Sequence, residues 1–161
     1  MSEPSAHGPS RLADLGAERA AWGAAGRKVV LTNGCFDLLH AGHVALLEAA
    51  RREGDVLVVA LNSDSSVRGL KGEGRPVVPE AERAEVLLAL EAVARVVLYD
   101  APTPIEVVKA LLPDVLVKGA DWAADAIVGG PEVEAAGGRV ARVRLLPGRS
   151  TSALVDRIRR P

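Results

Sequence analysis

Two of the three histidines of the chain fall in one tetrapeptide, His40-Ala-Gly-His43, where a predicted helix begins directly after a β-branched run. Residues three apart on the first turn of a helix share a face, so the two imidazoles can converge on one point. The free N–H groups and the positive dipole end of a helix N-terminus favour a phosphate there. Incidental surface histidines, or a histidine that caps the helix, are the structural alternatives. Two histidines in one tetrapeptide favour phosphate chemistry.

The residues around the histidines fit this interpretation. Gly34 would let the backbone approach a nucleotide, and Gly42 would leave room between the imidazole rings. Paired histidines can also bind a metal, but no third ligand is apparent nearby, so we predict no metal site. Cys35 has no paired base, and we expect it to be a small buried filler rather than a nucleophile.

Basic residues and a hydroxyl-rich turn mark other places where phosphates could bind. Lys118 ends the apolar run 115–117, where a charge must find a partner or face a cleft. Lys71, in the predicted loop after the second strand, also precedes a glycine, although a loop lysine can simply be solvated. The segment 148–152 precedes the last predicted helix, and its hydroxyls can cap that helix and bind an anion.

Three further charged residues could have structural roles instead of binding a ligand. Arg83 could decorate a helix face and pair with Glu80 at i, i+3. Asp37 and Asp64 could be turn-formers, since aspartate is common in turns.

Short β-branched runs alternate with helical segments along the chain. Continuous apolar character in four of the runs is typical of parallel strands that are covered on both faces. The alternation predicts right-handed βαβ crossovers and a doubly wound, three-layer α/β sandwich, whose ligands collect at the carboxyl ends of the strands. The predicted strands are Lys28–Thr32, Val56–Leu61, Arg95–Tyr99, Asp114–Lys118 and Arg139–Leu145, and the predicted helices are Arg11–Ala25, His43–Arg52, Glu80–Val93, Pro104–Leu112, Pro131–Ala136 and Thr151–Arg160.

Composition limits the class of protein. The 161 residues include 20 Lys+Arg and 21 Asp+Glu, a net charge of −1 that argues against a nucleic-acid binder. A single cysteine excludes an internal disulfide, and no apolar run approaches a membrane helix. The N-terminus resembles no secretory signal. We expect a flexible tail over residues 1–10, one domain over residues 11–161, and a cytoplasmic protein with neither nucleic acid nor membrane as a partner.

The motifs together resemble those of the cytidylyltransferase-like nucleotidyltransferases. The likeness begins with Gly34-Cys-Phe-Asp-Leu-Leu-His-Ala-Gly-His43 and spans most of the chain from Lys28 to Ile158. Class I aminoacyl-tRNA synthetases carry a related histidine motif but are far longer. The remaining matching segments are 61–64, 70–72, 75–77, 82–83, 116–122 and 150–151.

This resemblance implies a Rossmann-like nucleotidyltransferase fold with a five-stranded sheet, and it implies roles for individual residues. The implied catalytic residues are His40, His43, Lys71 and Lys118. The implied nucleotide contacts are Asn33, Gly34, Cys35, Phe36, Gly42, Gly119, Asp121, Arg149, Ser150 and Thr151. The implied acceptor contacts are Asp37, Asp64 and Arg75.

Within the family, the order and spacing are most similar to those of adenylyltransferases that act on D-glycero-β-D-manno-heptose 1-phosphate and form ADP-heptose, an intermediate for lipopolysaccharide or another glycan. The resemblance implies ATP and a sugar 1-phosphate as substrates, with Mg²⁺ carried on the nucleotide phosphates. It also implies that the protein is a homo-oligomer, namely a dimer. A separate kinase would supply the acceptor.

Other activities stay open from the sequence. Pantetheine-phosphate adenylyltransferases have a different first motif, because Leu38-Leu39-His40 stands here in its place. Glycerol-phosphate cytidylyltransferases share the first histidine, but their Arg-Thr-Glu-Gly-Ile-Ser-Thr turn differs from Leu146–Thr151. Archaeal-type FAD synthetases are a third alternative. A non-catalytic nucleotide sensor is the alternative from another class, and pyrophosphate release would distinguish it from an enzyme.

Overall fold

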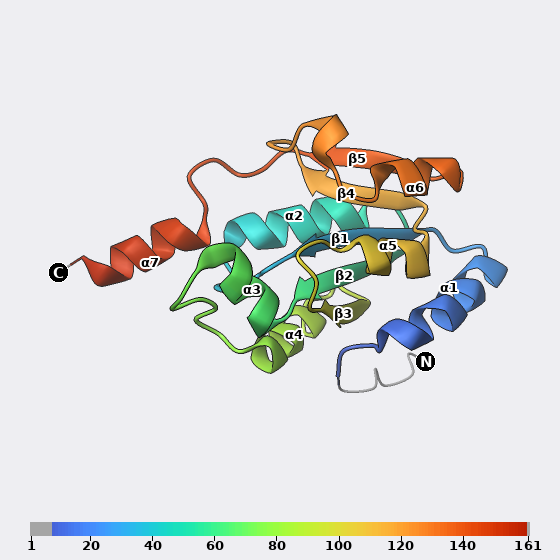
Figure 1. Cartoon of the computed structure of the whole chain (residues 1–161). Coiled ribbons are helices and arrows are strands. Elements are labelled where there is room, and N and C mark those ends of the chain that lie inside the picture. Colours follow the sequence, from blue (N-terminus) through green and yellow to red (C-terminus); the bar gives the residue numbers. More distant parts are fainter. Residues whose placement is uncertain (1–7, 161) are drawn as a thin grey trace.

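Runs of aliphatic and β-branched residues form five strands of one parallel sheet, as predicted (Figure 1). The structure is a computed structural model and describes residues 8–160. The strand order β3-β2-β1-β4-β5 confirms a doubly wound, Rossmann-like α/β fold. The strands are β1 (Val29–Gly34), β2 (Val56–Asn62), β3 (Arg95–Tyr99), β4 (Val115–Gly119) and β5 (Arg139–Val143).

Helices cover both faces of the sheet. All seven residues of β2 are buried, and alternate residues feed two separate cores: Val56 and Val58 pack in one, Leu57 and Val59 in the other. Burial of each such aliphatic side chain stabilises the fold by roughly 1.5–3 kcal/mol. One layer contains α1 (Leu15–Ala24), α5 (Ile105–Leu111) and α6 (Gly130–Ala135), and the other contains α2 (Ala41–Arg51) and α4 (Glu80–Leu88).

The topology creates a crevice between β1 and β4. From β1 the chain proceeds to β2 and β3 on one side, and then returns to place β4 and β5 on the other. The connections that leave β1 and β4 therefore diverge, which opens a crevice beyond their carboxyl ends. The Thr32 hydroxyl donates to the carbonyl oxygen of Val117 at 3.0 Å and ties the two strands together just below it. Lys118 therefore lies beside the end of β1.

One helix is absent from the sequence prediction. The segment α3 (Asp64–Lys71) follows β2, so Lys71 is the last residue of a helix and does not lie in a loop. Asp64 is likewise the first residue of this helix and not a turn-former. The hydroxyl of Ser63 caps α3 by accepting a hydrogen bond from the backbone N–H of Ser66 at 3.2 Å.

Several predicted boundaries also shift. The helix predicted over Glu80–Val93 ends at Leu88, and the strand predicted over Arg139–Leu145 ends at Val143. The first predicted helix divides into a 3₁₀ turn (Leu12–Asp14) and α1. In addition, α2 begins at Ala41, which makes His40 its N-cap residue. Differences of one or two residues are ordinary at helix ends. The prediction that the helix continues from Leu88 to Val93 is wrong.

The periphery of the sheet differs from its centre. Ser10, which we placed in the flexible tail, forms a parallel bridge with Val97, and its backbone N–H donates to the Val96 carbonyl at 2.7 Å. Residues 1–7 of that predicted tail lie outside the described part. At the other edge, β5 is partly exposed and carries the exposed Arg139 and Arg142.

The last helix, α7 (Thr151–Arg159), projects from the body of the molecule at the carboxyl end of the sheet (Figure 1). No residue of α7 is buried. Between residues 8 and 160, no helix is both long and apolar enough to cross a bilayer.

Candidate active site

The two histidines lie against each other at the N-terminus of α2. Their ring centroids are 3.8 Å apart and the rings are nearly parallel. Nδ1 of His40 accepts a hydrogen bond from the backbone N–H of Gly42 at 3.1 Å, and Nδ1 of His43 accepts from the backbone N–H of His40 at 3.4 Å. In each neutral ring the proton is therefore on Nε2, which is left to donate to a ligand. His40 thus caps the helix and still presents a donor.

Both imidazoles are neutral at pH 7. Burial, together with the neighbouring His40, lowers the pKa of His43 to about 4, against an opposing effect of the Leu38 carbonyl. Burial and the positive charge of Arg149 also lower the pKa of His40. The ring of His43 is half-buried between His40 and Phe36.

Tight packing fixes the positions of these rings. The ring of Phe36 is tilted on that of His43, with centroids 5.2 Å apart, and Phe36 has a positive φ of 44°, a strained conformation for a large side chain. A Cβ atom on Gly34 would lie 2.9 Å from the Phe36 ring. A Cβ atom on Gly42 would lie 2.8 Å from Cε1 of His40 and 2.9 Å from Cβ of Arg149. Gly42 therefore lets His40 and Arg149 approach the start of α2, whereas the room that we expected between the two imidazole rings is absent because the rings stack on each other.

Lys118, at the end of β4, faces the same crevice from the other side. Burial lowers its pKa to about 8, although Asp121 and Cys35 act in the opposite direction. Its Nζ atom lies 5.0 Å from the centroid of the Trp122 ring, a cation–π contact. A Cβ atom on Gly119 would lie 2.7 Å from Oδ1 of Asp121, so this turn is closely packed as well. Lys118 is a half-buried cation without an ion pair among residues 8–160.

Asp37 organises the loop that carries Arg75. Its carboxylate accepts hydrogen bonds from Nε of Arg75 at 2.7 Å and from the backbone N–H groups of Val77 and Val78 at 2.9 Å. Burial alone would raise the pKa of Asp37, but these N–H donors and the Arg75 charge together hold the pKa below its ordinary value. Asp37 therefore keeps its charge, and Arg75 is fixed with its terminal nitrogens free.

Arg83 is a buried structural hub. Its guanidinium donates to the carbonyl oxygens of Val78, Cys35 and Asn62 and pairs with the Asp64 carboxylate at 2.8 Å. The alternative pairing with Glu80 does not form, because the Glu80 carboxylate instead accepts from the backbone N–H of Asp64. Arg83 thus ties together the ends of β1 and β2 and the loop before α4.

The N-terminus of α7 closes the site from a third direction. The hydroxyl of Ser150 accepts from the backbone N–H of Ala153 at 3.1 Å and caps the helix. The hydroxyl of Thr151 donates to the Leu38 carbonyl at 3.4 Å, which joins α7 to the segment before His40. Arg149 lies beside Gly42, as described above. The predicted capping role of this turn is confirmed, and its free N–H groups stay available to an anion.

These groups line one cavity of about 640 Å³ at the carboxyl edge of the sheet. Gly119 and Asp64 do not line it, while every other residue that the sequence assigned to the site does. Cys35 lines the cavity and is half-buried rather than buried, and burial raises the pKa of its thiol. Because its thiol is protonated and no base is paired with it, Cys35 is not a nucleophile.

The sequence prediction missed several cavity residues. Asn62 and Tyr99 end β2 and β3, so the strand-end rule that identified Lys118 applies equally to them. Asn33 donates through Nδ2 to the Tyr99 hydroxyl at 3.2 Å, while its buried Oδ1 has no partner in the described part of the chain. Polar hydrogen-bonding groups therefore line the β1–β3 side of the cavity. Apolar residues line it near β4 and β5, among them Trp122, Val128, Leu145 and Leu146.

The side chains of residues 8–160 include no group of three or more histidine, cysteine, aspartate or glutamate residues that could hold a metal ion. Of the carboxylates that line the cavity, that of Asp37 already accepts hydrogen bonds from Arg75 and from two backbone N–H groups.

The comparisons with known proteins agree with this geometry. The family model described as cytidylyltransferase-like matches residues 31–146, which include the histidine pair. The chain belongs to the cytidylyltransferase-like family. As a member of that family it is a nucleotidyltransferase, and the resemblance inferred from the motifs is confirmed.

Relatives of this cytidylyltransferase-like chain include two proteins named bifunctional protein HldE. The one from Methylobacillus flagellatus is 54% identical over 85% of the chain and 28% of its own length. The one from Magnetococcus marinus is 58% identical over 86% of the chain and 28% of its own length. The chain therefore spans less than a third of the curated relatives that it matches.

A solved structure shares the fold. The lipopolysaccharide core biosynthesis protein from Thermoplasma volcanium is 28% identical, with a TM-score of 0.62, and the match covers 74% of this chain and 97% of that protein. The Rossmann-like nucleotidyltransferase fold is thus shared across most of both chains.

Proposed function

We propose that the protein transfers AMP from ATP to D-glycero-β-D-manno-heptose 1-phosphate and releases ADP-heptose and pyrophosphate. The observation that carries this proposal is the stacked His40–His43 pair at the N-terminus of α2, whose Nδ1 atoms accept backbone N–H groups, so that each neutral ring donates through Nε2. Support for the sugar phosphate comes from the motif order, from the HldE relatives and from the likeness to a lipopolysaccharide core biosynthesis protein.

The chemistry needs alignment more than acid–base catalysis. A phosphate monoester has a second pKa near about 6, so the acceptor is largely a dianion at neutral pH and attacks without a general base. One of its oxygens forms a bond to the α-phosphorus while the bond to the bridging oxygen breaks and pyrophosphate leaves. Two carboxylates line the cavity: that of Asp37 is held by N–H donors, and that of Asp121 lies close to the charge of Lys118.

The side chains of the cavity would stabilise this transition state. His40 and His43 would donate to the α-phosphate and the bridging oxygen, where negative charge increases. Lys71, Lys118 and the Arg149–Thr151 turn would hold the triphosphate and the departing pyrophosphate, and Arg75 would contact the acceptor. Mg²⁺ enters with the nucleotide as part of the substrate and neutralises the phosphate oxygens. A sugar kinase is the class of enzyme that must supply the acceptor.

A pyrophosphate-release panel tests the proposal. ATP and CTP are each combined with heptose 1-phosphate, glycerol 3-phosphate and phosphopantetheine. We expect release with ATP and heptose 1-phosphate and little with the other five pairs. Release mainly with CTP and glycerol 3-phosphate would reassign the chain as a glycerol-phosphate cytidylyltransferase. Binding of ATP without release from any pair would instead identify a nucleotide sensor.

A further inference from the structure

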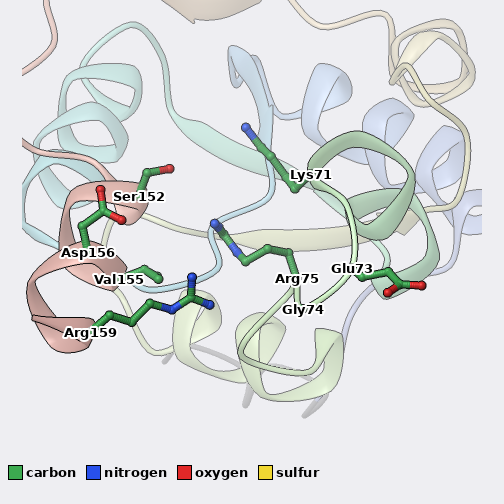
Figure 2. A pocket seen from close by; sticks show the side chains of 8 residues that line it. All are labelled: Lys71, Glu73, Gly74, Arg75, Ser152, Val155, Asp156 and Arg159. Carbon is green, nitrogen blue, oxygen red and sulfur yellow. The ribbon is translucent and has the colours of Figure 1, made fainter.

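A second, smaller cavity lies between α7 and the segment that follows α3 (Figure 2). Its volume is about 240 Å³. Lys71, Arg75 and Ser152 line both this cavity and the large one, so the two adjoin. A ligand in the small cavity would therefore lie next to the histidine site.

One face of α7 forms a wall of this small cavity. Ser152, Val155, Asp156 and Arg159 are spaced by three, one and three residues, which places them on the same side of the helix. No residue of α7 is buried. This face therefore looks across a polar gap toward residues 71–75, and it does not pack on the apolar core.

The cations that line the gap outnumber the carboxylates, with Lys71, Arg75 and Arg159 against Glu73 and Asp156. Figure 2 shows the guanidinium groups of Arg75 and Arg159 directed toward each other, whereas the Glu73 carboxylate points away from them. Asp37 holds Nε of Arg75 at 2.7 Å, and Arg159 makes no ion pair within residues 8–160. Two cations that face each other repel unless an anion lies between them. Arginine forks match a phosphate geometrically and bind it through paired hydrogen bonds.

We propose that Arg159 is an acceptor-binding residue that holds, together with Arg75, the phosphate group of the acceptor in the small cavity. The inference rests on the proposed function, since it assumes a phosphorylated acceptor. Helix α7 would then contact both substrates. Its N-terminus faces the nucleotide in the large cavity, and the face that carries Arg159 contacts the acceptor in the small cavity. The phosphates of ATP are the other source of the same chemical group, and the test distinguishes the two.

Two substitutions on α7 provide a matched comparison. Arg159→Gln removes the cation that lines the cavity, and Arg157→Gln removes an exposed cation of the same helix that lines neither cavity. Pyrophosphate release is measured while heptose 1-phosphate and ATP are varied in turn. We expect Arg159→Gln to raise the KM for the acceptor about tenfold, the scale of one hydrogen bond to a charged group, with kcat and the KM for ATP within about twofold of wild type. Arg157→Gln should leave all three unchanged.

For a third variant we expect the opposite change in the KM for the acceptor. Asp156 lines the same cavity, so Asp156→Asn removes a charge that repels an anion there and should lower the KM for the acceptor. Equal values for Arg159→Gln and Arg157→Gln would overturn the proposal. A rise in the KM for ATP alone would overturn it too, since the cavity would then take the nucleotide phosphates.

A binding measurement keeps this proposal separate from the proposed function. Wild type, Arg159→Gln and Arg157→Gln are titrated calorimetrically with inorganic phosphate while α,β-methylene-ATP saturates the nucleotide site. Weaker phosphate binding by Arg159→Gln alone supports the anion site even if heptose 1-phosphate proves not to be a substrate. Equal phosphate affinity in all three proteins would refute the site whatever the acceptor is.

Discussion

His40 and His43 each use Nδ1 to accept a backbone hydrogen bond, so the protein itself selects the tautomer that a ligand meets. Hydrogen bonds from neutral Nε2–H groups strengthen when negative charge increases on the acceptor atom in a transition state. Because the rings are already fixed, they need no reorganisation. Phe36, whose ring packs against His43, has a positive φ, a strained backbone conformation.

Replacement of His43 by alanine should lower kcat by at least about 10²-fold, the usual effect of losing one transition-state donor. Because the ring stacks on His40 and contacts Phe36, we also expect a loss of about 0.5–1.5 kcal/mol in the free energy of unfolding. Pyrophosphate release and urea denaturation measure the two effects. Val44→Ala, at the exposed next position of α2, is the control. Near-normal turnover of the His43 variant would remove this residue from the catalytic set.

The acid limb of kcat/KM should come from the acceptor and not from His43. Burial lowers the pKa of His43 to about 4, so this ring stays neutral at pH 6 in the free enzyme. The acceptor takes up its second proton near pH ~6 and loses nucleophilicity there. A phosphonate acceptor with a different second pKa should move the limb by a similar amount. A limb that stays in place for both acceptors would point to an enzyme group and exclude the self-activated nucleophile.

Stability must be followed in the same pH series. The folded-state pKa of His43, about 4, is below the ordinary value of 6.5, so the unfolded chain binds this proton more readily. The contribution of His43 is therefore present above about pH 6.5 and is lost as the pH falls toward 4. Thermal unfolding at each pH separates this effect from the kinetic one.

Lys118→Met should raise the KM for ATP about tenfold, the scale of one charge-assisted hydrogen bond, with little loss of thermal stability. The cation is costly to bury, as its pKa near 8 indicates, so a methionine of similar length can pack there at small cost. In the wild-type enzyme, nucleotide affinity should fall as the pH rises through about 8, because the free lysine then loses its charge. Lys109→Met, on the exposed side of α5, is the matched control. Should the variant be unstable while its folded fraction binds ATP normally, Lys118 is structural.

At the scale of whole elements, the start of α2 lies so close to the imidazole ring of His40 that no Cβ atom fits at Gly42, the second residue of the helix. Gly42→Ala improves helix propensity, yet it would place Cβ 2.8 Å from His40 and 2.9 Å from Arg149. We expect kcat to fall at least about tenfold, since displacement of a positioned group by even ~1 Å is expensive. Circular dichroism should show an intact fold.

Gly69→Ala provides the matched control for this prediction. Gly69 lies within α3, and a Cβ atom there meets nothing within 4 Å. The substitution should leave kcat unchanged and stabilise the protein by about 0.5–1 kcal/mol. Equal activity in the two alanine variants would show that the close packing around Gly42 does not position His40.

The elements differ in how far the sequence specified them. Strand β2 was predictable because its apolar run is uninterrupted. Such a run is typical of a parallel strand whose two faces are both covered by helices. Helix α3 was missed because Asp64-Ser-Ser-Val-Arg-Gly-Leu-Lys71 contains two serines and a glycine, and its apolar residues are few. The signal that was available is the capping residue Ser63, followed by Val67 and Leu70 three apart.

Within the site, residue types and strand ends identified most of the cavity, but contacts between distant segments were out of reach. Nothing in the local sequence of α4 shows that Arg83 meets the carbonyl oxygens of Cys35 and Asn62. The half-burial of His43 likewise depends on how the strained loop places Phe36. Both are consequences of tertiary packing, which periodicity does not encode.

Over the whole molecule, charge is distributed unevenly. The net charge is −1, but the side chains that line the large cavity include four lysine or arginine residues (Lys71, Arg75, Lys118 and Arg149) and the two carboxylates of Asp37 and Asp121. Such a cleft attracts anionic substrates over a distance that salt shortens, from about 10 Å at 0.1 M to about 3 Å at 1 M.

We therefore expect kcat/KM to fall severalfold between about 50 mM and 500 mM KCl, mainly through KM. Thermal unfolding at each salt concentration should show little change, because few of the stabilising contacts are exposed ion pairs. A flat kcat/KM over this range would show that the cavity charges do not contribute to substrate capture.

The two edges of the sheet also affect how copies of the protein behave when they meet. An open strand edge can template pairing with another chain and start aggregation. Ser10 occupies part of the β3 edge through its bridge to Val97, and Arg139 and Arg142 place exposed charge along β5. A second copy that approached β5 would meet the exposed side chains of Arg139 and Arg142, of which Arg139 pairs with Glu53. We expect these side chains to disfavour edge-to-edge pairing of the sheet.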